Sequence, residues 1–155
     1  MAKAIPDGYH SITPYLIVDD AAKALQFYEK AFGATELMRI EGPDGRIGHA
    51  EMKIGDSAIM LADEYPTMGY RSPTSLGGAG VSLMVYVDKA DETFQQALSC
   101  GAQEIQPVKD QFYGDRSGTV KDPFGHVWTI STHVEDIAPD ELRRRAEQVM
   151  QQMSH

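Results

Sequence analysis

His49 and Glu51 are the pair in this sequence best suited to proton chemistry. Residues two apart in an extended strand point to the same face, so this imidazole and this carboxylate would lie side by side. A carboxylate orients a neighbouring imidazole and favours its charged form, which suits acid–base catalysis. The same pair, joined by His10 or His126, would form a non-standard metal site. The structural alternative is a polar strand face with a His–Glu hydrogen bond.

Arg116 offers a different chemistry. A guanidinium group can hold a carboxylate or phosphonate ligand through two parallel hydrogen bonds. The alternative role is an ion pair with Asp115 or Asp122 that fixes a loop. Cys100 is the single cysteine, and its neighbours Ser99 and Gly101 provide no base, so we interpret it as a packed thiol.

The elements that would position these side chains occur twice. Val18-Asp19 precedes a helical stretch that ends near Gly33, and Val87-Asp88 precedes another that ends near Gly101. The offset between the copies is about 69 residues, with a slip of one at the glycine. A repeat of this length predicts two copies of one supersecondary unit, with a site where the copies meet.

Each copy reads as a βαβββ unit. Alternating β-branched and aromatic residues predict the strands, a 3.6-residue apolar stripe predicts each helix, and Gly-Pro-Asp-Gly type segments predict the turns. Pro14 lies inside the first predicted strand and restricts that position to an edge, a bulge or the strand's start. The predicted strands are 12–18, 36–40, 47–54, 57–62, 81–87, 103–108, 118–120 and 126–132.

These elements predict an α+β fold in four segments. A first βαβββ module covers residues 9–64, a linker without asserted structure covers 65–80, and a second module covers 81–132. Residues 133–155 form a C-terminal helical extension. Its apolar stripe packs on its own sheet or on a partner, and the Arg143-Arg144-Arg145 triplet is interpreted as a solvated face.

Composition narrows the function classes. The chain has 155 residues and a formal net charge of −9, which argues against a nucleic-acid partner. No stretch has the length and apolarity of a signal peptide or a membrane span, so we expect no membrane association. A lone cysteine excludes an internal disulfide and is typical of the cytoplasm, where we expect the protein to reside.

Several stretches together resemble the vicinal oxygen chelate superfamily, which contains glyoxalase I, extradiol dioxygenases, fosfomycin-resistance enzymes and bleomycin-resistance proteins. The similarity covers roughly residues 9–132 and is greatest to the PhnB-like branch. The stretches that carry it are Thr13-Pro14-Tyr15-Leu16, Gly48-His49-Ala50-Glu51, Tyr113-Gly114-Asp115-Arg116 and Asp122-Pro123-Phe124-Gly125. The resemblance implies a curved mixed sheet around a cavity, the glyoxalase/bleomycin-resistance fold, and a homodimer.

In metal-dependent members, four strand positions around the cavity supply His, Glu or Gln ligands. The resemblance carries these positions onto Thr13, Met60, Ser82 and Thr129, which obey the 69-residue offset. Hydroxyls and a thioether are poor ligands for a divalent ion of this kind. We therefore expect no metal and no cofactor, and without a Lewis acid the superfamily's usual chemistry is not expected.

Two functions from different classes follow. The first is a protein that binds a small organic molecule in a metal-free cavity. The second is an enzyme of the same superfamily, of lyase, isomerase or dioxygenase type, that uses a non-standard metal site or His49/Glu51 acid–base chemistry. A third hypothesis is partner binding through the C-terminal helix. The residues expected to contact the ligand are Thr13, Tyr15, Met60, Ser82, Met84, Tyr113, Arg116 and Thr129.

Overall fold

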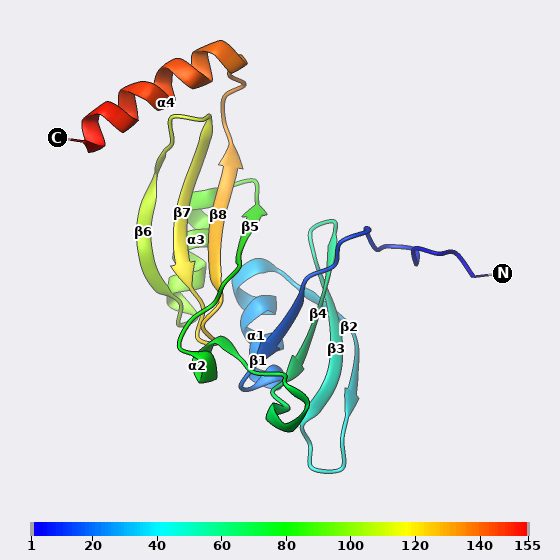
Figure 1. The fold of residues 1–155 in the computed structure, drawn as a ribbon. Coiled ribbons are helices and arrows are strands. Elements are labelled where there is room, and N and C mark those ends of the chain that lie inside the picture. Colours follow the sequence, from blue (N-terminus) through cyan, green and yellow to red (C-terminus); the bar gives the residue numbers. More distant parts are fainter. Residues whose placement is uncertain (1, 155) are drawn as a thin grey trace.

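The computed structural model describes residues 2–154 and contains two βαβββ modules followed by a helix (Figure 1). This confirms the predicted α+β class, the repeat and the C-terminal helix. The first module consists of β1 (Tyr15–Val18), α1 (Ala21–Phe32), β2 (Thr35–Glu41), β3 (Ile47–Ile54) and β4 (Ser57–Asp63).

The second module consists of β5 (Ser82–Tyr86), α3 (Ala90–Ser99), β6 (Gln103–Asp110), β7 (Asp115–Lys121) and β8 (Val127–His133). The eight strands form two four-stranded mixed sheets, in the orders β1-β4-β3-β2 and β5-β8-β7-β6. In both sheets the first strand pairs in parallel with the last, and the other pairs are antiparallel. The modules therefore share one topology.

The strand register repeats as closely as the sequence does. Tyr15 pairs with Met60 in the first sheet, and Met84 pairs with Thr129 in the second. Adding 69 to the first pair of numbers gives the second pair. The offset found in the sequence is thus the offset of the folded modules.

Local signals explain where α1 begins and ends. The Asp20 side chain accepts a hydrogen bond from the Lys23 amide and caps the first turn. Gly33 ends the helix in the left-handed conformation with φ of 70°, which a residue without a side chain adopts at no steric cost. The chain can therefore turn directly into β2.

The main differences from the sequence prediction concern the first strand, β7 and the segment 65–80. The first strand starts at Tyr15 instead of residue 12, after Pro14, whose ring nitrogen has no hydrogen to donate to a ladder. β7 is longer than the predicted 118–120, because the ladder with β8 continues to Asp115. The segment 65–80 contains a 3₁₀ turn, Pro66–Met68, and the short helix α2, Pro73–Leu76, each begun by a proline.

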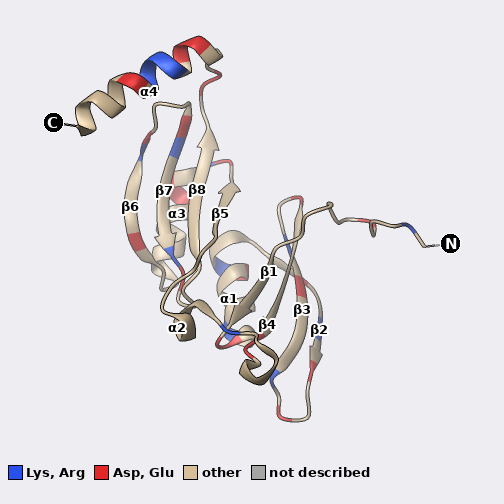
Figure 2. Ribbon diagram, in the orientation of Figure 1, with Lys and Arg blue, Asp and Glu red and all other residues tan. Residues whose placement is uncertain are grey.

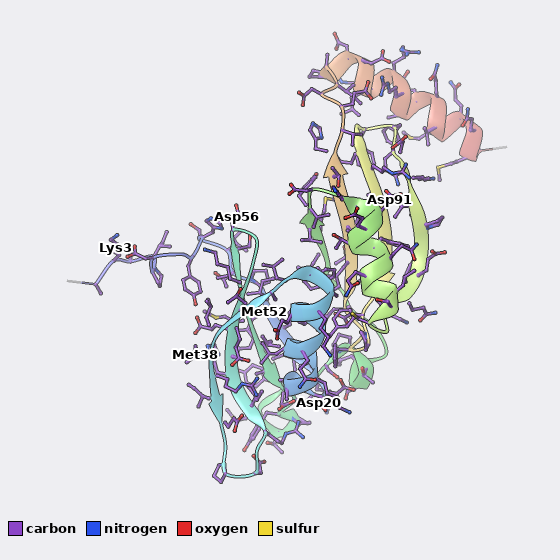
Figure 3. All side chains as sticks on the ribbon, turned by 180° about the vertical axis from the view of Figure 1, so that it is seen from behind. Lys3, Asp20, Met38, Met52, Asp56 and Asp91 are labelled. Carbon is purple, nitrogen blue, oxygen red and sulfur yellow. The ribbon has the colours of Figure 1, made fainter. Side chains whose placement is uncertain are left out.

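Each sheet has a helix-covered face and an open face. The helices α1 and α3 lie on the same side of the molecule, and they are seen in front of the sheets in Figure 3. The helix-covered face of the first sheet carries the buried side chains of Leu16, Met52 and Leu61, as period-two alternation predicts. The open face of the first sheet carries Tyr15, Ile17, Ile40, His49, Glu51 and Met60.

A buried carboxylate joins the two modules. Asp122, only 3% exposed, accepts hydrogen bonds from the Tyr28 hydroxyl at 2.5 Å and the Trp128 indole nitrogen at 2.9 Å. It also accepts from the amides of Phe124 and His126, both at 2.9 Å. Burial, and then the charge of Asp122, raise the pKa of Tyr28 well above its ordinary value. Tyr28 of the first module therefore keeps its hydroxyl hydrogen and donates it to Asp122, which lies in the β7–β8 turn of the second module.

The helix α4, Pro139–Met153, projects beyond the second sheet and has no buried residue (Figure 1). Its basic triplet lies between acidic residues, visible as blue flanked by red in Figure 2. Arg145 connects α4 to the rest of the chain. Its guanidinium donates to the Glu135 carboxylate, at 2.9 and 3.0 Å, and to the Phe112 carbonyl. Within residues 2–154, no helix is long and apolar enough to cross a membrane.

Replacing Asp122 by alanine is expected to lower the free energy of unfolding by about 3–5 kcal/mol, because several buried donors lose their acceptor. Tyr28→Phe removes one of these bonds and is expected to cost about 1–2 kcal/mol. Urea unfolding at fixed protein concentration measures both. The control Asp56→Ala, in the exposed β3–β4 turn, should change stability by less than about 0.5 kcal/mol. Equal effects of Asp56→Ala and Asp122→Ala would contradict the role given to Asp122.

Candidate functional site

A cavity of about 830 Å³ lies on the open face of the first module. It is bounded by β1, by the β2–β3 turn and by the chain that follows β4. The apolar part of its wall consists of Ile17, Ile40, Ile47, Ala62 and Met68. Tyr15, Tyr65 and Tyr70 supply aromatic rings and hydroxyls. The wall is thus mostly apolar with a few polar groups, the usual composition of a small-molecule site.

One polar group in this wall is held by a chain of hydrogen bonds. The Tyr15 hydroxyl lies 2.8 Å from His49 Nδ1, and His49 Nε2 lies 2.8 Å from a Glu51 carboxylate oxygen. A carboxylate only accepts, so in the neutral ring Nε2 carries the hydrogen and Nδ1 has the lone pair. Tyr15 then donates to Nδ1. The pairing of His49 with Glu51 matches the hydrogen bond weighed as the structural alternative.

This chain determines what Tyr15 offers to a ligand. Its hydrogen is engaged by His49, so the phenol oxygen has a lone pair free to accept. A tyrosine phenol is neutral at physiological pH, and burial, and secondly Tyr70, raise the pKa of Tyr15 further. Such a chain can accept a proton at Tyr15 while passing one to His49. Glu51 would stabilise the imidazolium formed.

Of the eight residues expected to contact a ligand, Tyr15 lines this cavity. Thr13 precedes β1, and its hydroxyl donates to the His10 carbonyl at 3.4 Å. Met60 lies beside Tyr15 on the open face. Ser82, Met84 and Thr129 share the open face of the second sheet, where Thr129 is hydrogen-bonded to Thr119 at 3.1 Å. A single chain therefore distributes the expected residues over two sheets and, for Thr13 and Tyr113, over the segments that precede β1 and β7.

The positions that hold metal in the superfamily do not fit a metal here. Thr13, Met60, Ser82 and Thr129 offer three hydroxyls and a thioether. Thr13 precedes β1, Met60 lies in the first sheet, and Ser82 and Thr129 lie in the second. The non-standard site also lacks a third ligand: within residues 2–154, no three His, Cys, Asp or Glu side chains are grouped to hold an ion. His126 instead lies 3.0 Å from the Ile17 carbonyl through Nε2 and joins the modules.

Arg116 is not placed to bind a ligand in this cavity. Its guanidinium forms a two-hydrogen-bond ion pair with Asp91 of α3, at 2.6 and 2.9 Å, and a further bond to Asp110 at 3.2 Å. These contacts give Arg116 a structural ion-pair role, as the alternative expected, but they join β7 to α3 and β6 instead of fixing a loop, and the partners are not Asp115 or Asp122. The reason is the longer β7, which places Arg116 in a strand beside the helix.

A second polar cluster lies at the end of the second sheet. The buried Asp115 carboxylate accepts from the Tyr86 hydroxyl and lies 2.9 Å from His133 Nδ1. His133 Nε2 lies 2.7 Å from Asp136. These hydrogen bonds, first that of Asp115 and then that of Asp136, raise the pKa of His133. The fully buried Ser131 hydroxyl, on the same face of β8, has no partner among the described residues.

Sequence reasoning missed two groups of residues. It placed Tyr65, Met68 and Tyr70 in a linker without structure, although two tyrosines in a polar Gly- and Pro-containing stretch are a usable signal for a binding loop. It also gave no role to Tyr86 and His133. Their meeting depends on the β5–β8–β7 register, which local sequence does not reveal.

A sequence model of the Glyoxalase/Bleomycin resistance protein/Dioxygenase superfamily matches residues 8–130. The chain belongs to this superfamily. It is 46% identical over 136 residues to the uncharacterized protein Rv0887c of Mycobacterium tuberculosis, covering 86% of this chain and 80% of that protein. It is 46% identical over the same length to the uncharacterized protein Mb0911c of Mycobacterium bovis, covering 90% of that protein.

Solved structures of the superfamily's fold agree. TioX from Micromonospora sp. ML1 superposes with a TM-score of 0.63 and 27% identity, over 81% of this chain and 99% of TioX. Protein PA1353 from Pseudomonas aeruginosa gives 0.67 and 25%, over 81% and 99%. A PhnB protein from Bacillus cereus gives 0.62 and 18%, over 79% and 99%, and supports the fold alone. The family model thus confirms the predicted resemblance to the superfamily.

Asp136→Asn is expected to lower the pKa of His133, because a carboxylate favours the imidazolium and an amide does not. NMR titration of the histidine ring protons measures this shift. In the unaltered protein the folded-state pKa lies above the ordinary 6.5. The interaction therefore stabilises the fold fully below that pH and is lost as the pH rises through the folded-state value. The control Asp140→Asn should leave His133 unchanged; an unchanged pKa in Asp136→Asn would contradict the assignment.

Proposed function

We propose that this protein binds a small organic molecule in the open-face cavity of its first module. The observation that carries the proposal is the cavity itself, which has the volume and the mostly apolar wall of a ligand site. The second-module residues expected to contact the ligand are Ser82, Met84 and Thr129. They would contact a ligand in this cavity only if a second open face lay against it. Superfamily membership fits, since its bleomycin-resistance branch implies ligand binding without catalysis.

Binding is proposed to need no metal ion. The support is chemical: the four superfamily metal positions carry hydroxyls and a thioether, which are poor ligands for the divalent ions concerned. The ligand would instead be held by apolar contact and by hydrogen bonds to groups such as the Tyr15 oxygen. We place the protein in the cytoplasm, because its one cysteine leaves no internal disulfide.

An enzyme of the same superfamily is the second candidate, and the Tyr15–His49–Glu51 hydrogen-bond chain favours it. Proton transfer through this chain would need a ligand with an acidic hydrogen at Tyr15. Turnover of a bound compound that disappears in Glu51→Gln would favour the enzyme. Binding without turnover would favour the first candidate.

A homodimer is proposed because the open faces expose large apolar side chains. Tyr15, Ile40, Met84 and Tyr86 are between 46% and 60% exposed. Exposed apolar patches of this kind mark interaction surfaces. A second copy packed on these faces would cover them and enclose the cavity.

A screen of metabolites and antibiotics by thermal unfolding should find compounds that raise Tm, because a ligand that binds the native state stabilises it. Ile40→Ser, in the cavity wall, is expected to weaken the binding of such a compound about tenfold through lost apolar contact. Leu37→Ser, on the same strand but outside the wall, is the control.

Prior treatment with EDTA should leave the Tm shift unchanged. Loss of the shift after EDTA would contradict the metal-free proposal. Equal weakening by the two serine substitutions would contradict the location of the site.

Met84→Asp should shift the protein from dimer towards monomer at micromolar concentration, because a charge would be buried in the packed faces. Analytical ultracentrifugation measures the mass. Met150→Asp on α4 is the matched control, since the two methionines are 50% and 60% exposed. Dissociation only in Met150→Asp would assign the interface to α4 and contradict the open-face dimer.

A further inference from the structure

The open-face cavity has aromatic rings on several sides. Tyr65 and Tyr70 are held opposite each other by two backbone hydrogen bonds, at 2.8 and 3.1 Å, which form an isolated β-bridge. Their side chains are 59% and 53% exposed, so the ring surfaces are accessible. Tyr15 lines the cavity from β1, with its hydroxyl engaged by His49. Three phenol rings thus lie around one space.

Aromatic faces have a defined electrostatic preference. The π-electron quadrupole makes the face of a tyrosine ring negative, and organic cations bind over such faces. The sulfur of Met68 and the aliphatic residues of the wall are compatible with the alkyl groups of such a cation. The wall therefore suits a cation whose charge is spread over an apolar body.

The charged residues of the cavity also favour a cation. Its lining contains four carboxylates, those of Glu41, Asp44, Asp63 and Glu64, and the guanidinium of Arg46. Arg39, outside the lining, pairs with Glu41 at 3.4 Å, and the carboxylates still outnumber the two guanidinium groups. Figure 2 shows acidic residues at the β2–β3 turn that borders the cavity. A negative lining raises the local concentration of cations and lowers that of anions.

The two carboxylates at the end of β4 are held by neutral donors. Asp63 accepts from the amides of Ala21 and Ile47, both at 2.7 Å. Glu64 accepts from the amide and hydroxyl of Ser72 and from the hydroxyl of Ser75. These hydrogen bonds, those of Ser72 first, hold the pKa of Glu64 below its ordinary value. Amides and hydroxyls supply the hydrogen bonds to these oxygens, and the charge of Arg46 makes the last and smallest contribution to the lowered pKa of Glu64.

Arg46 is the group that would favour the opposite ligand. Its guanidinium donates to the Glu64 backbone carbonyl at 3.3 Å. An organic anion bound to Arg46 would lie among the cavity's carboxylates, and their repulsion would weaken its binding. The balance of charge in the lining is therefore against an anion.

We propose that the cavity binds a small organic cation, such as a quaternary or alkylated ammonium compound, over the rings of Tyr15, Tyr65 and Tyr70 and beside the carboxylates of its rim. This inference rests on the proposed function and adds the charge class of the ligand. The cation contributes charge and the alkyl groups contribute apolar area. Neutral compounds of the same shape would gain only the second.

The test uses three probes of one size that differ in charge: choline, 3,3-dimethylbutan-1-ol and 3,3-dimethylbutanoate. Chemical shift changes of the ¹⁵N-labelled full chain, followed to tens of millimolar probe, give each Kd and locate the site. Choline is expected to bind about tenfold more tightly than the neutral alcohol, and the anion more weakly than both. The advantage of choline should decrease at high salt.

Two pairs of variants sharpen the test. Tyr70→Leu should weaken choline binding about fivefold, whereas Tyr70→Phe, which keeps the aromatic face, should bind as the unaltered protein does. Arg46→Gln should strengthen choline binding about threefold, because it removes the cation from the lining. Arg46→Lys, which keeps the charge, is the control. Amide spectra of every variant report whether the fold is retained.

The outcomes separate this inference from the proposed function. Equal affinity for the three probes, preference for the anion, or weaker choline binding in Arg46→Gln would overturn the cation inference. The cavity would remain a ligand site if other compounds still raised Tm through Ile40. Absence of choline binding up to tens of millimolar would also overturn the inference. Failure of the whole compound screen is a separate result and would overturn the proposed function.

Discussion

The buried carboxylate of Asp122 is the constraint on which the arrangement of the two modules depends. A charge taken out of water is tolerated only when its oxygens are hydrogen-bonded, and here a tyrosine, an indole and two amides supply those bonds. Because Tyr28 belongs to α1 and the other three donors belong to the second module, separating the modules would remove one of the four hydrogen bonds of this buried carboxylate. The helices α1 and α3 therefore stay packed together, and both open faces turn to the other side.

The open-face cavity follows from a similar use of backbone donors. Asp63 ends β4 and accepts from the first amide of α1 and the first amide of β3, which fixes the relative positions of three elements. Glu64 then ties the following chain to Ser72 and Ser75, so that Tyr65 and Tyr70 stand over the sheet. The carboxylates that shape the cavity are thus also part of its electrostatics.

Much of this fold could be predicted because its signals are local or repeated. The helix stripes, the turn residues and the 69-residue offset define both modules, and the offset holds in the register of Tyr15 with Met60 and Met84 with Thr129. The site was predicted less well. Arg116 is ion-paired with Asp91, which is 25 residues away, and Tyr65 reaches the cavity through its bridge to Tyr70. Such contacts depend on tertiary packing, which periodicity does not encode.

The contact between His126 and Ile17 has a consequence for sheet growth. Strand β1 lies at the edge of its sheet, where unpaired carbonyls can recruit the strand of another molecule. The Ile17 carbonyl oxygen is already engaged, because His126 Nε2 lies 3.0 Å from it. A strand that added to this edge would first have to displace the ring. The contact that joins the modules therefore also blocks strand addition at β1, whereas β2, β5 and β6 form the other edges of the two sheets.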